Sequence, residues 1–395
     1  MKITFITNDA EGGVASFILY LTKNIPIGYS IKLIVTQNIS IKSNSQQVNE
    51  CIYNNIEFIR FKYSKYDNKF YILKKLKKLI CKDEVIIAND GIELEMFATQ
   101  RLLNPLIFIL HGDYDYYYDL AETYKNVIDK FVTINNGMSY ILKNLIPERK
   151  NDIIHLWPPV PIISNKEKYN YVNNLKIVFI GRITKEKGAF DLPIIDNLLI
   201  ENGTQVEWFI IGNGYLEEIS QIWKNERVHY LGQINNQKLL DTLKMYDLII
   251  LPSRFESLGL VIVEGMKAGL VPLTSNLETG VSEFIEDSKN GFLIDILDFN
   301  SYVNRICLLD KNRELLEQIG KSARNTANKI FNPEINTNNY YAVFSQLKNK
   351  QSNKSRFIPI TFSRLDKKLI PNFLVIILRK LINYNKSILK ICVVL

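Results

Sequence analysis

The sequence predicts an α/β protein with two domains, each a parallel β-sheet covered by helices on both faces. Short, continuously apolar runs alternate with helical spacing through the first third of the chain. The same alternation restarts after the proline-rich stretch HLWPPVPIISNKEKYNYVNN. Continuous apolar runs separated by helices indicate strands buried on both faces. A length of 395 residues also favours two domains over one.

Strand candidates can be placed along both domains. In the first, expected over residues 1–162, they are KITFIT, YSIKLIVT, IEFIRF, EVIIAND, PLIFILHG and KFVTINN. A linker over 163–174 leads to the second, expected over 175–330, with LKIVFIG, VEWFIIG, VHYLG, DLIILPS, LVPLTSN and GFLID. In such sheets ligands bind beyond the carboxyl ends of the strands. The glycines and charges that follow these runs therefore mark an expected cleft between the domains.

Composition limits the function classes. The four cysteines lie far apart and the three histidines form no HExxH, so neither a disulfide framework nor a protein metal site is expected. The N-terminal MKITFIT lacks the regions of a signal peptide, and no window approaches the ~20 apolar residues of a membrane span. We therefore expect a cytoplasmic protein.

Two turns of the second domain contain glycine. FIGRITKEKG places Gly181, Arg182 and Lys187 after a strand, and its cations suit the oxygens of a diphosphate; alone, it fits a solvated turn equally well. IIGNGYLEE gives Gly212 in a GxG that lacks the third glycine and the following acid of the dinucleotide fingerprint. That absence argues against a dehydrogenase and leaves a tight strand-to-helix turn as the simpler interpretation.

Two glutamates flank the apolar segment of RFESLGLVIVEG. Glu256 and Glu264 are eight residues apart. On one helix that is about 12 Å, more than the roughly 5–9.5 Å between the carboxyls of glycosidases. Two such acids can instead hold hydroxyls at the two ends of a nucleotide-sugar. The helix start between them is expected to offer backbone N–H groups to an anion from Ser257, Leu258, Gly259 and Leu260. Alternatively, Glu256 is a helix-start acid and Glu264 a surface residue.

A histidine follows a strand of the first domain. His111 opens HGDYDYYYD and is expected to face the cleft, although a loop histidine is commonly structural. The same stretch contains a DxD at Asp113 and Asp115, a three-residue pattern that arises often by chance. We do not expect it to bind a metal ion.

Taken in order, these segments resemble the retaining glycosyltransferases of family 4. The resemblance extends over residues 1–345 and is more specific in the second half. It rests on GG at Gly12–Gly13, HGD at His111, GRITKEKG, GNG, VHYLGQINNQKLLDTLKMYDLIILPSRFESLGLVIVEGMKAG and LTSNLETGVSEFIEDSKNGFLI. The resemblance implies the GT-B fold, in which two Rossmann-like domains face each other across a cleft.

The resemblance also implies roles. Glu264 would bind the ribose of a UDP-linked donor, Glu256 the transferred sugar, and Arg182 with Lys187 the diphosphate. His111 would contact the sugar. Other implied donor contacts are Gly12, Gly13, Gly181, Gly212, Ser257, Leu258, Gly259 and Leu260. Transfer would retain the anomeric configuration without metal ion or cofactor, the nucleotide-sugar being a co-substrate. One departure is GGVAS, where many relatives carry a basic residue after the double glycine.

Two other interpretations stay open. The first is another GT-B enzyme. A nucleotide-sugar epimerase would release an altered sugar nucleotide without an acceptor, and a phosphorylase would need phosphate or a pyridoxal cofactor. A non-catalytic partner could keep the fold alone. The joint presence of Arg182, Lys187, Glu256 and Glu264 argues against this last class.

The C-terminus is strongly basic. From residue 351 on, nine basic residues stand against one acid, which equals the net charge of +8 of the whole chain. The fold implies that residues 331–350 cross back to the first domain, and 351–395 form an additional basic amphipathic tail. A helix in the tail and a second cationic helix over residues 70–82 are predicted.

Segments 70–82 and 366–395 are expected to hold the protein on the anionic inner face of the plasma membrane. There a glycan or lipid-linked acceptor of capsule or O-antigen/lipopolysaccharide assembly would be found. Alternatively, the tail is a packed helix with solvated lysines. Nucleic acid is disfavoured because the charge is confined to the tail and one helix.

Overall fold

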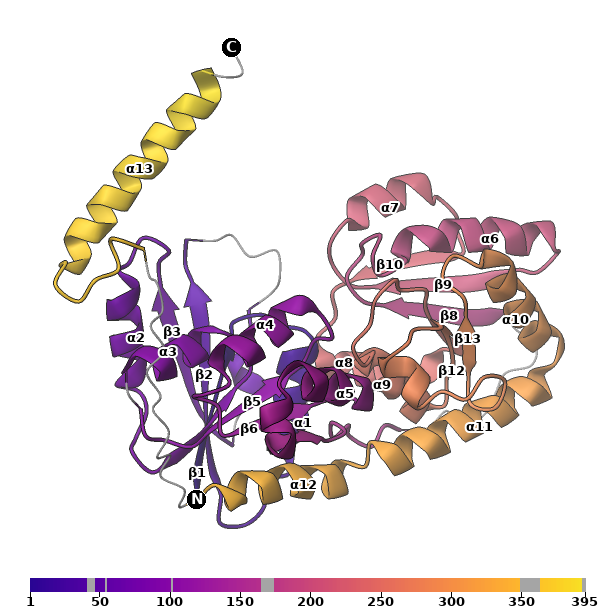
Figure 1. The fold of residues 1–395 in the computed structure, drawn as a ribbon. Helices are drawn as coiled ribbons and strands as arrows, with labels where there is room; N and C mark the ends of the chain where they lie inside the picture. Colours follow the sequence, from indigo (N-terminus) through magenta and orange to yellow (C-terminus); the bar gives the residue numbers. More distant parts are fainter. Residues whose placement is uncertain (41–46, 54, 101, 165–173, 349–362, 393–395) are drawn as a thin grey trace.

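The computed structural model describes residues 1–40, 47–53, 55–100, 102–164, 174–348 and 363–392. These residues form two parallel sheets, one in each half of the chain (Figure 1). The prediction of two parallel-sheet α/β domains is confirmed. Short 3-10 helices occur at Glu50–Ile52, Pro147–Asp152, Ala189–Asp191, Leu243–Met245 and Gly280–Glu283.

The first sheet has seven strands within the described residues. They are β1 (Lys2–Asn8), β2 (Ser30–Asn38), β3 (Glu57–Tyr63), β4 (Glu84–Ala88), β5 (Leu106–Leu110), β6 (Lys130–Thr133) and β7 (Ile153–His155), in the order β3-β2-β1-β4-β5-β6-β7. The helices are α1 (Gly13–Lys23), α2 (Lys69–Lys77), α3 (Ile92–Gln100), α4 (Asp115–Tyr124) and α5 (Asn136–Leu145). The sequence predicted β1 to β6. It missed β7, because three residues are too few to give an apolar run.

The second sheet has six strands within the described residues. They are β8 (Leu175–Ile180), β9 (Val206–Ile211), β10 (Val228–Gly232), β11 (Leu248–Leu251), β12 (Val271–Ser275) and β13 (Phe292–Ile294), in the order β10-β9-β8-β11-β12-β13. The helices are α6 (Leu192–Glu201), α7 (Leu216–Ile222), α8 (Asn236–Thr242), α9 (Leu260–Ala268), α10 (Phe299–Lys311) and α11 (Arg313–Ile330). All six strands were predicted.

Both sheets reverse their strand order once. In the first sheet the reversal lies between β1 and β4, and in the second between β8 and β11. These central strands carry fully buried runs, such as Glu84–Ala88 in β4 and Leu248–Leu251 in β11. The carboxyl ends of the strands at such a reversal are where doubly wound sheets bind ligands. Each domain therefore offers one expected ligand-binding edge.

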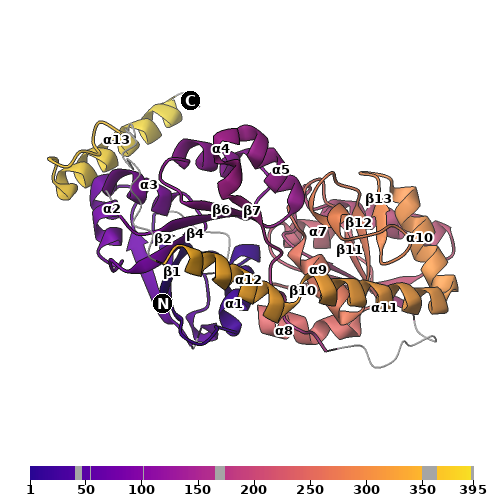
Figure 2. The ribbon, with the colours of Figure 1, turned by 60° about the horizontal axis from the view of Figure 1, so that its bottom comes forward.

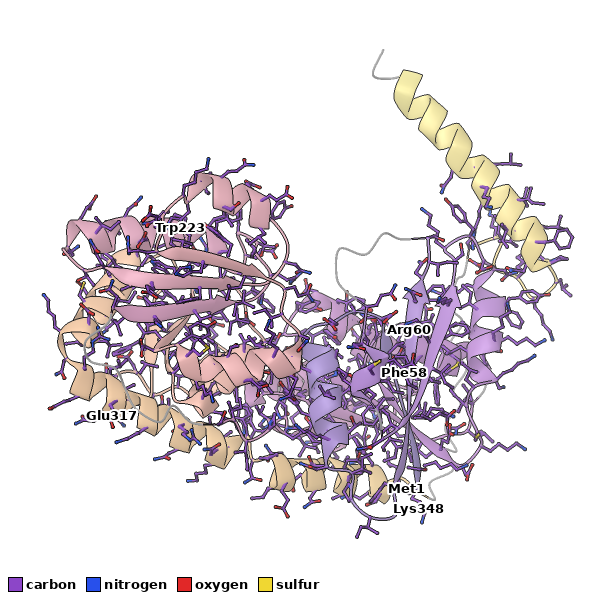
Figure 3. The ribbon with its side chains drawn as sticks, turned by 180° about the vertical axis from the view of Figure 1, so that it is seen from behind. Met1, Phe58, Arg60, Trp223, Glu317 and Lys348 are labelled. Atoms are coloured by element: carbon purple, nitrogen blue, oxygen red, sulfur yellow. The ribbon has the colours of Figure 1, made fainter. Side chains whose placement is uncertain are left out.

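The chain returns to the first domain through α12 (Pro333–Gln346), which continues from α11 along one side of the molecule (Figure 2). The ring of Tyr340 packs edge-on against Phe17 of α1 at 5.3 Å, and its hydroxyl donates to the carbonyl oxygen of Leu156 at 2.9 Å. Lys348, just after α12, lies beside Met1 at the base of the first sheet (Figure 3). The other crossing, the expected linker 163–174, falls mostly outside the described residues.

The C-terminal helix α13 (Asn372–Cys392) contacts the first domain near α2 and then projects away from the body (Figure 1). Asn372 accepts from the backbone N–H of Asn68 at 2.6 Å and donates to Asp67 at 2.8 Å. Arg379 pairs with Asp366 at 2.6 Å. The start of the tail is therefore fixed to the loop before α2. The cationic helix predicted over 70–82 is shorter than expected: α2 ends at Lys77.

Candidate active site

The predicted site residues follow the carboxyl ends of strands in both domains, where the two sheets face each other. In the first domain, Gly12 and Gly13 follow β1 and His111 follows β5. In the second, the loop with Gly181, Arg182 and Lys187 follows β8, and Glu256 follows β11. The ends of β1, β8 and β11 are the reversal points of their sheets, so the fold gathers these residues at the expected ligand-binding edges.

Lys187 and Glu256 form an ion pair between the β8 and β11 loops. The distance from Nζ to Oε1 is 2.5 Å, and both side chains are largely buried. Lys187 also donates to the backbone oxygen of Phe255 at 3.3 Å, and Ser253 donates to Glu256 at 3.3 Å. A charge-assisted bond between partly buried groups fixes both side chains. The structure thus brings together two residues that are 69 positions apart in the sequence.

The two loops meet at Gly188. Its φ of 73° is left-handed, and a Cβ at this position would lie 2.2 Å from the carbonyl oxygen of Pro252. Only glycine fits this close approach without strain. The backbone N–H of Arg254 also donates to the carbonyl oxygen of Glu186 at 2.8 Å. Gly188 therefore positions Lys187 beside Glu256.

Glu264 lies inside α9 and is only 2% exposed, which rules out the alternative of a surface residue. Its Oε1 accepts a hydrogen bond of 2.7 Å from the hydroxyl of Tyr20, on α1 of the first domain. Burial raises the pKa of the Glu264 carboxyl to about 7, and the bond from Tyr20 opposes this shift. Near neutral pH the group is thus poised between its neutral and ionised forms, as perturbed carboxyls at functional sites often are.

The segment before α9 is held by the first domain. The helix begins at Leu260, preceded by the left-handed Gly259, so Ser257 and Leu258 lie in the loop and not in the helix as expected. Ser257 accepts from the backbone N–H of Asp113 at 2.9 Å and, through its carbonyl oxygen, from Asn135 at 2.5 Å. Glu256 is in the same loop, so the estimate of about 12 Å along one helix does not describe the pair.

His111 is a neutral imidazole of fixed orientation. The Asn89 amide donates to the carbonyl oxygens of Ile6 at 3.0 Å and Ile87 at 3.2 Å, so its oxygen faces Nε2 of His111 at 2.8 Å. Nε2 must then carry the proton, which leaves Nδ1 as an acceptor. Burial lowers the pKa of His111 to about 3. His111 can therefore accept a hydrogen bond from a hydroxyl at any ordinary pH.

The glycines and Arg182 differ in what surrounds them. A Cβ on Gly12 or Gly13 would meet nothing within 4 Å, so the start of α1 is open. A Cβ on Gly212 would lie 1.8 Å from the carbonyl oxygen of Gly181, so this close approach already accounts for glycine at position 212. Arg182 is exposed. Burial raises the pKa of the Tyr114 phenol in the other domain, and the positive charge of Arg182 opposes this shift.

Sequence reasoning missed several residues that join the domains or orient a site residue here. Tyr20 was hidden in an apolar helical run, and Asn89 follows β4 without any motif. Glu283 of the second domain accepts from the backbone N–H groups of Asn136 at 2.8 Å and Gly137 at 2.8 Å, at the start of α5. Such an acid at a helix N-terminus is favoured by the helix dipole, but its partner helix lies in the other domain and could not be foreseen.

Asp113 of the DxD is occupied by other contacts. Its carboxylate accepts from Tyr118 and from Thr279 of the second domain. Across the described part of the chain, no group of three or more His, Cys, Asp and Glu side chains is placed to hold a metal ion.

None of the helices within the described residues reaches the length and apolarity that crossing a bilayer requires.

Comparison with known proteins gives matches over both domains. Residues 163–326 match the family described as Glycosyl transferases group 1. An uncharacterized glycosyltransferase of Haemophilus influenzae is 27% identical over 279 residues, 66% of this chain and 77% of that protein. The capsular polysaccharide biosynthesis glycosyltransferase CapM of Staphylococcus aureus is 24% identical over 305 residues, 67% of this chain and 79% of that protein.

The fold also has solved counterparts. The Anabaena Alr3699/HepE structure in complex with UDP-glucose superposes with a TM-score of 0.72 at 19% identity, covering 88% of this chain and 100% of that one. At this identity the match concerns the fold alone. Together with the two facing parallel sheets, it identifies the architecture as GT-B.

Proposed function

Because the second domain belongs to the glycosyl transferases group 1 and the chain has the GT-B fold, we propose that this protein is a retaining, metal-independent glycosyltransferase. It moves a sugar from a UDP-linked nucleotide-sugar to a hydroxyl of a glycan or lipid-linked acceptor in cell-envelope polysaccharide assembly. The observation that carries the proposal is the Lys187–Glu256 pair, which lies at the carboxyl ends of the reversal strands of the second sheet.

The geometry of each side chain supports the role that the resemblance implies for it. Glu264, ionised, accepts hydrogen bonds from ribose hydroxyls. Lys187 and the exposed Arg182 neutralise the diphosphate, and Glu256, held by Lys187, accepts from a hydroxyl of the transferred sugar. Nδ1 of His111 accepts from another sugar hydroxyl. The two cations stabilise the diphosphate as it takes up negative charge on leaving, which is the main electrostatic contribution to the rate.

The start of α1 supports the same arrangement. Gly12 and Gly13 are open, and no acid lies in the first turn of the helix. The N-terminus of a helix favours negative charge, so α1 can approach the diphosphate from the first domain. This contact takes the place of the basic residue that GGVAS lacks.

Two similarities support the choice of donor and pathway. The HepE structure that superposes on this chain holds UDP-glucose, and CapM is described as an enzyme of capsular polysaccharide biosynthesis. We infer from these a uracil nucleotide and an acceptor in an envelope glycan.

A thermal-shift panel of UDP, GDP, ADP and their sugar conjugates, with and without EDTA, tests the donor site. A ligand at 100 times its Kd should stabilise the fold by about 2.7 kcal/mol. Glu264→Gln should weaken nucleotide binding about 10- to 100-fold, the scale of hydrogen bonds to a charged group. Glu256→Gln should lower turnover about 100-fold with nucleotide affinity unchanged. The surface variant Glu286→Gln is the matched control. If no nucleotide stabilises the wild-type protein, the non-catalytic alternative is favoured.

We also propose that the tail holds the protein on an anionic membrane surface, at the inner face of the plasma membrane. Along α13 an apolar stripe is left exposed, its members between 41% and 62% accessible: Phe373, Leu374, Ile377, Leu378, Leu381 and Ile382. Val375, in contrast, is fully buried. Figure 1 places α13 on the same side of the first domain as α2, which carries Lys69, Lys74, Lys75 and Lys77. Each cation near an anionic leaflet contributes about 1 kcal/mol.

Vesicle flotation tests this attachment. The full chain should float with phosphatidylglycerol vesicles and not with phosphatidylcholine vesicles. Replacing Phe373, Ile377 and Leu381 together by serine should abolish flotation. Ile335→Ser, at another exposed apolar residue of a helix, should leave it intact. Equal flotation of both variants would refute the role of the stripe.

A further inference from the structure

Tyr20 is a buried tyrosine whose hydroxyl reaches into the other domain. It lies on α1 and is 3% exposed, and its hydroxyl donates to Oε1 of Glu264 at 2.7 Å. The two residues are 244 positions apart in the sequence and come from the two facing domains. Glu264 is the residue to which the proposed function assigns the ribose of the donor.

The direction of this hydrogen bond is fixed by a third residue. The Asn236 amide, at the start of α8, donates to the hydroxyl oxygen of Tyr20 at 2.7 Å and to the hydroxyl of Ser16 at 3.3 Å. The phenol oxygen therefore accepts from Asn236 and has its single proton to give to Glu264. Burial and the charge of Glu264 raise the pKa of Tyr20 well above its usual value, so the phenol stays a donor.

A ribose hydroxyl would use Glu264 in the same way, as an O–H donating to the carboxylate. The carboxylate is almost completely enclosed, and Tyr20 already holds one of its oxygens. Resting on the proposed function, we propose that the Tyr20 hydroxyl competes with the nucleotide at the donor site, because it occupies the position on Glu264 that a ribose hydroxyl takes. Nucleotide binding then exchanges an interdomain hydrogen bond for one to the ligand.

This exchange has two consequences. It reduces the net gain from the ribose hydroxyls, because a bond to the same carboxylate is lost when each nucleotide binds. It also releases α1 from α9, so the empty protein holds its domains together more firmly at this point than the nucleotide-bound protein does. Other interdomain bonds, such as that from Gln233 to Glu11 at 3.1 Å, are not part of the exchange.

The variant Tyr20→Phe isolates the hydroxyl. In the free variant Glu264 lacks this donor, so ribose hydroxyls bind without displacing one. We expect UDP to bind about 10-fold more tightly than to the wild type, which corresponds to one hydrogen bond to a charged group. The affinity for 2′,3′-dideoxy-UDP, which has no ribose hydroxyl to offer Glu264, should be unchanged. Burial raises the pKa of the Glu264 carboxyl to about 7, so the calorimetric titration is carried out at about pH 8.5, where this group is largely ionised.

Tyr53→Phe is the matched control. Tyr53 is 4% exposed, and its hydroxyl donates to the backbone oxygen of Ala15 on α1 at 3.0 Å, so the variant removes a buried hydroxyl that touches the same helix but not Glu264. Its affinities for both nucleotides should match the wild type. Asn236→Ala, which removes the donor to Tyr20 and leaves Glu264 intact, should shift UDP affinity in the same direction as Tyr20→Phe and by less.

The outcomes separate the two proposals. If UDP binds Tyr20→Phe no more tightly than it binds the wild type, the proposed exchange is wrong. It is also wrong if the dideoxy analogue gains as much affinity as UDP does. In both cases the donor site itself stands, because UDP binds. If the wild type and both tyrosine variants bind none of UDP, GDP and ADP, the proposed function fails and the role of Tyr20 fails with it.

Discussion

Replacing Lys267 by methionine removes a buried amine from the junction of the domains. Lys267 is fully buried on α9, and its Nζ donates to the carbonyl oxygens of Val160 at 2.7 Å and Phe331 at 2.9 Å. Val160 precedes the expected linker and Phe331 joins α11 to α12, so one side chain ties both crossings to α9. Burial, with a smaller contribution from Arg324, lowers the pKa of Lys267 from 10.5 to about 7.

The sign of the pH effect follows from which state holds the proton. Below pH 7 the amine is protonated in both the folded and the unfolded chain, and the folded chain bears the full cost of burying the charge. Between pH 7 and 10.5 the unfolded chain keeps a proton that the folded chain has released, so the free energy of unfolding rises with pH. At about 1.4 kcal/mol per pKa unit, the complete shift corresponds to at most about 4–5 kcal/mol.

The assay is urea denaturation of the wild type and Lys267→Met at about pH 6.5, 8 and 9.5. Near pH 6.5 the two proteins should differ little, because removing a buried charge offsets the loss of its hydrogen bonds. By about pH 9.5 the wild type should gain about 3 kcal/mol relative to the variant. Other titrating groups cancel in the difference between the proteins. A difference that stays constant over this range would refute both the lowered pKa and the argument from burial.

Two further predictions concern the active site. Gly188→Ala should destabilise the fold by about 2–4 kcal/mol, because the new Cβ collides with Pro252 in addition to the backbone strain; Gly203→Ala, at φ 72° but with nothing within 4 Å, should cost only about 1 kcal/mol. Equal losses of stability in the two variants, measured by thermal unfolding, would contradict the collision with Pro252. His111 should show no titration by NMR between about pH 5 and 8, whereas Asn89→Asp, which places a carboxylate against Nε2, should bring its pKa into that range. A wild-type midpoint near 6.5 would contradict the burial of the ring.

The sequence predicted the sheets, the turns that follow their strands and the burial of Glu264 because these depend on local patterns. Continuous apolar runs marked twelve of the thirteen strands within the described residues, and turns after those runs marked Gly181 and Gly212. The apolar residues before Glu264 argued against an exposed acid, and the carboxyl is indeed buried. Each of these signals is contained within about ten residues of the chain.

What the sequence could not predict depends on contacts between distant segments. Tyr20 lies in the run VASFILYLTK, where it is indistinguishable from a core residue until α1 is placed against α9. Lys267 is of a residue type that is mostly exposed, yet it is fully buried by the two crossings. The loop conformation of Ser257 and Leu258 was also missed, because the left-handed Gly259 delays the start of the helix to Leu260.

The positions of Glu264 and Lys267 on α9 suggest how a ligand at the first would act on the domains. Three residues apart, they lie on the same side of the helix, which is the side that meets the first domain and the two crossings. Lys267 bonds to backbone carbonyls that no ligand replaces, whereas the bond of Glu264 to Tyr20 is open to exchange with a ribose. The contact at Lys267 is therefore kept when a nucleotide binds, whereas the contact at Glu264 is exchanged. A movement of the first domain that follows nucleotide binding should pivot near Lys267 and be largest at α1.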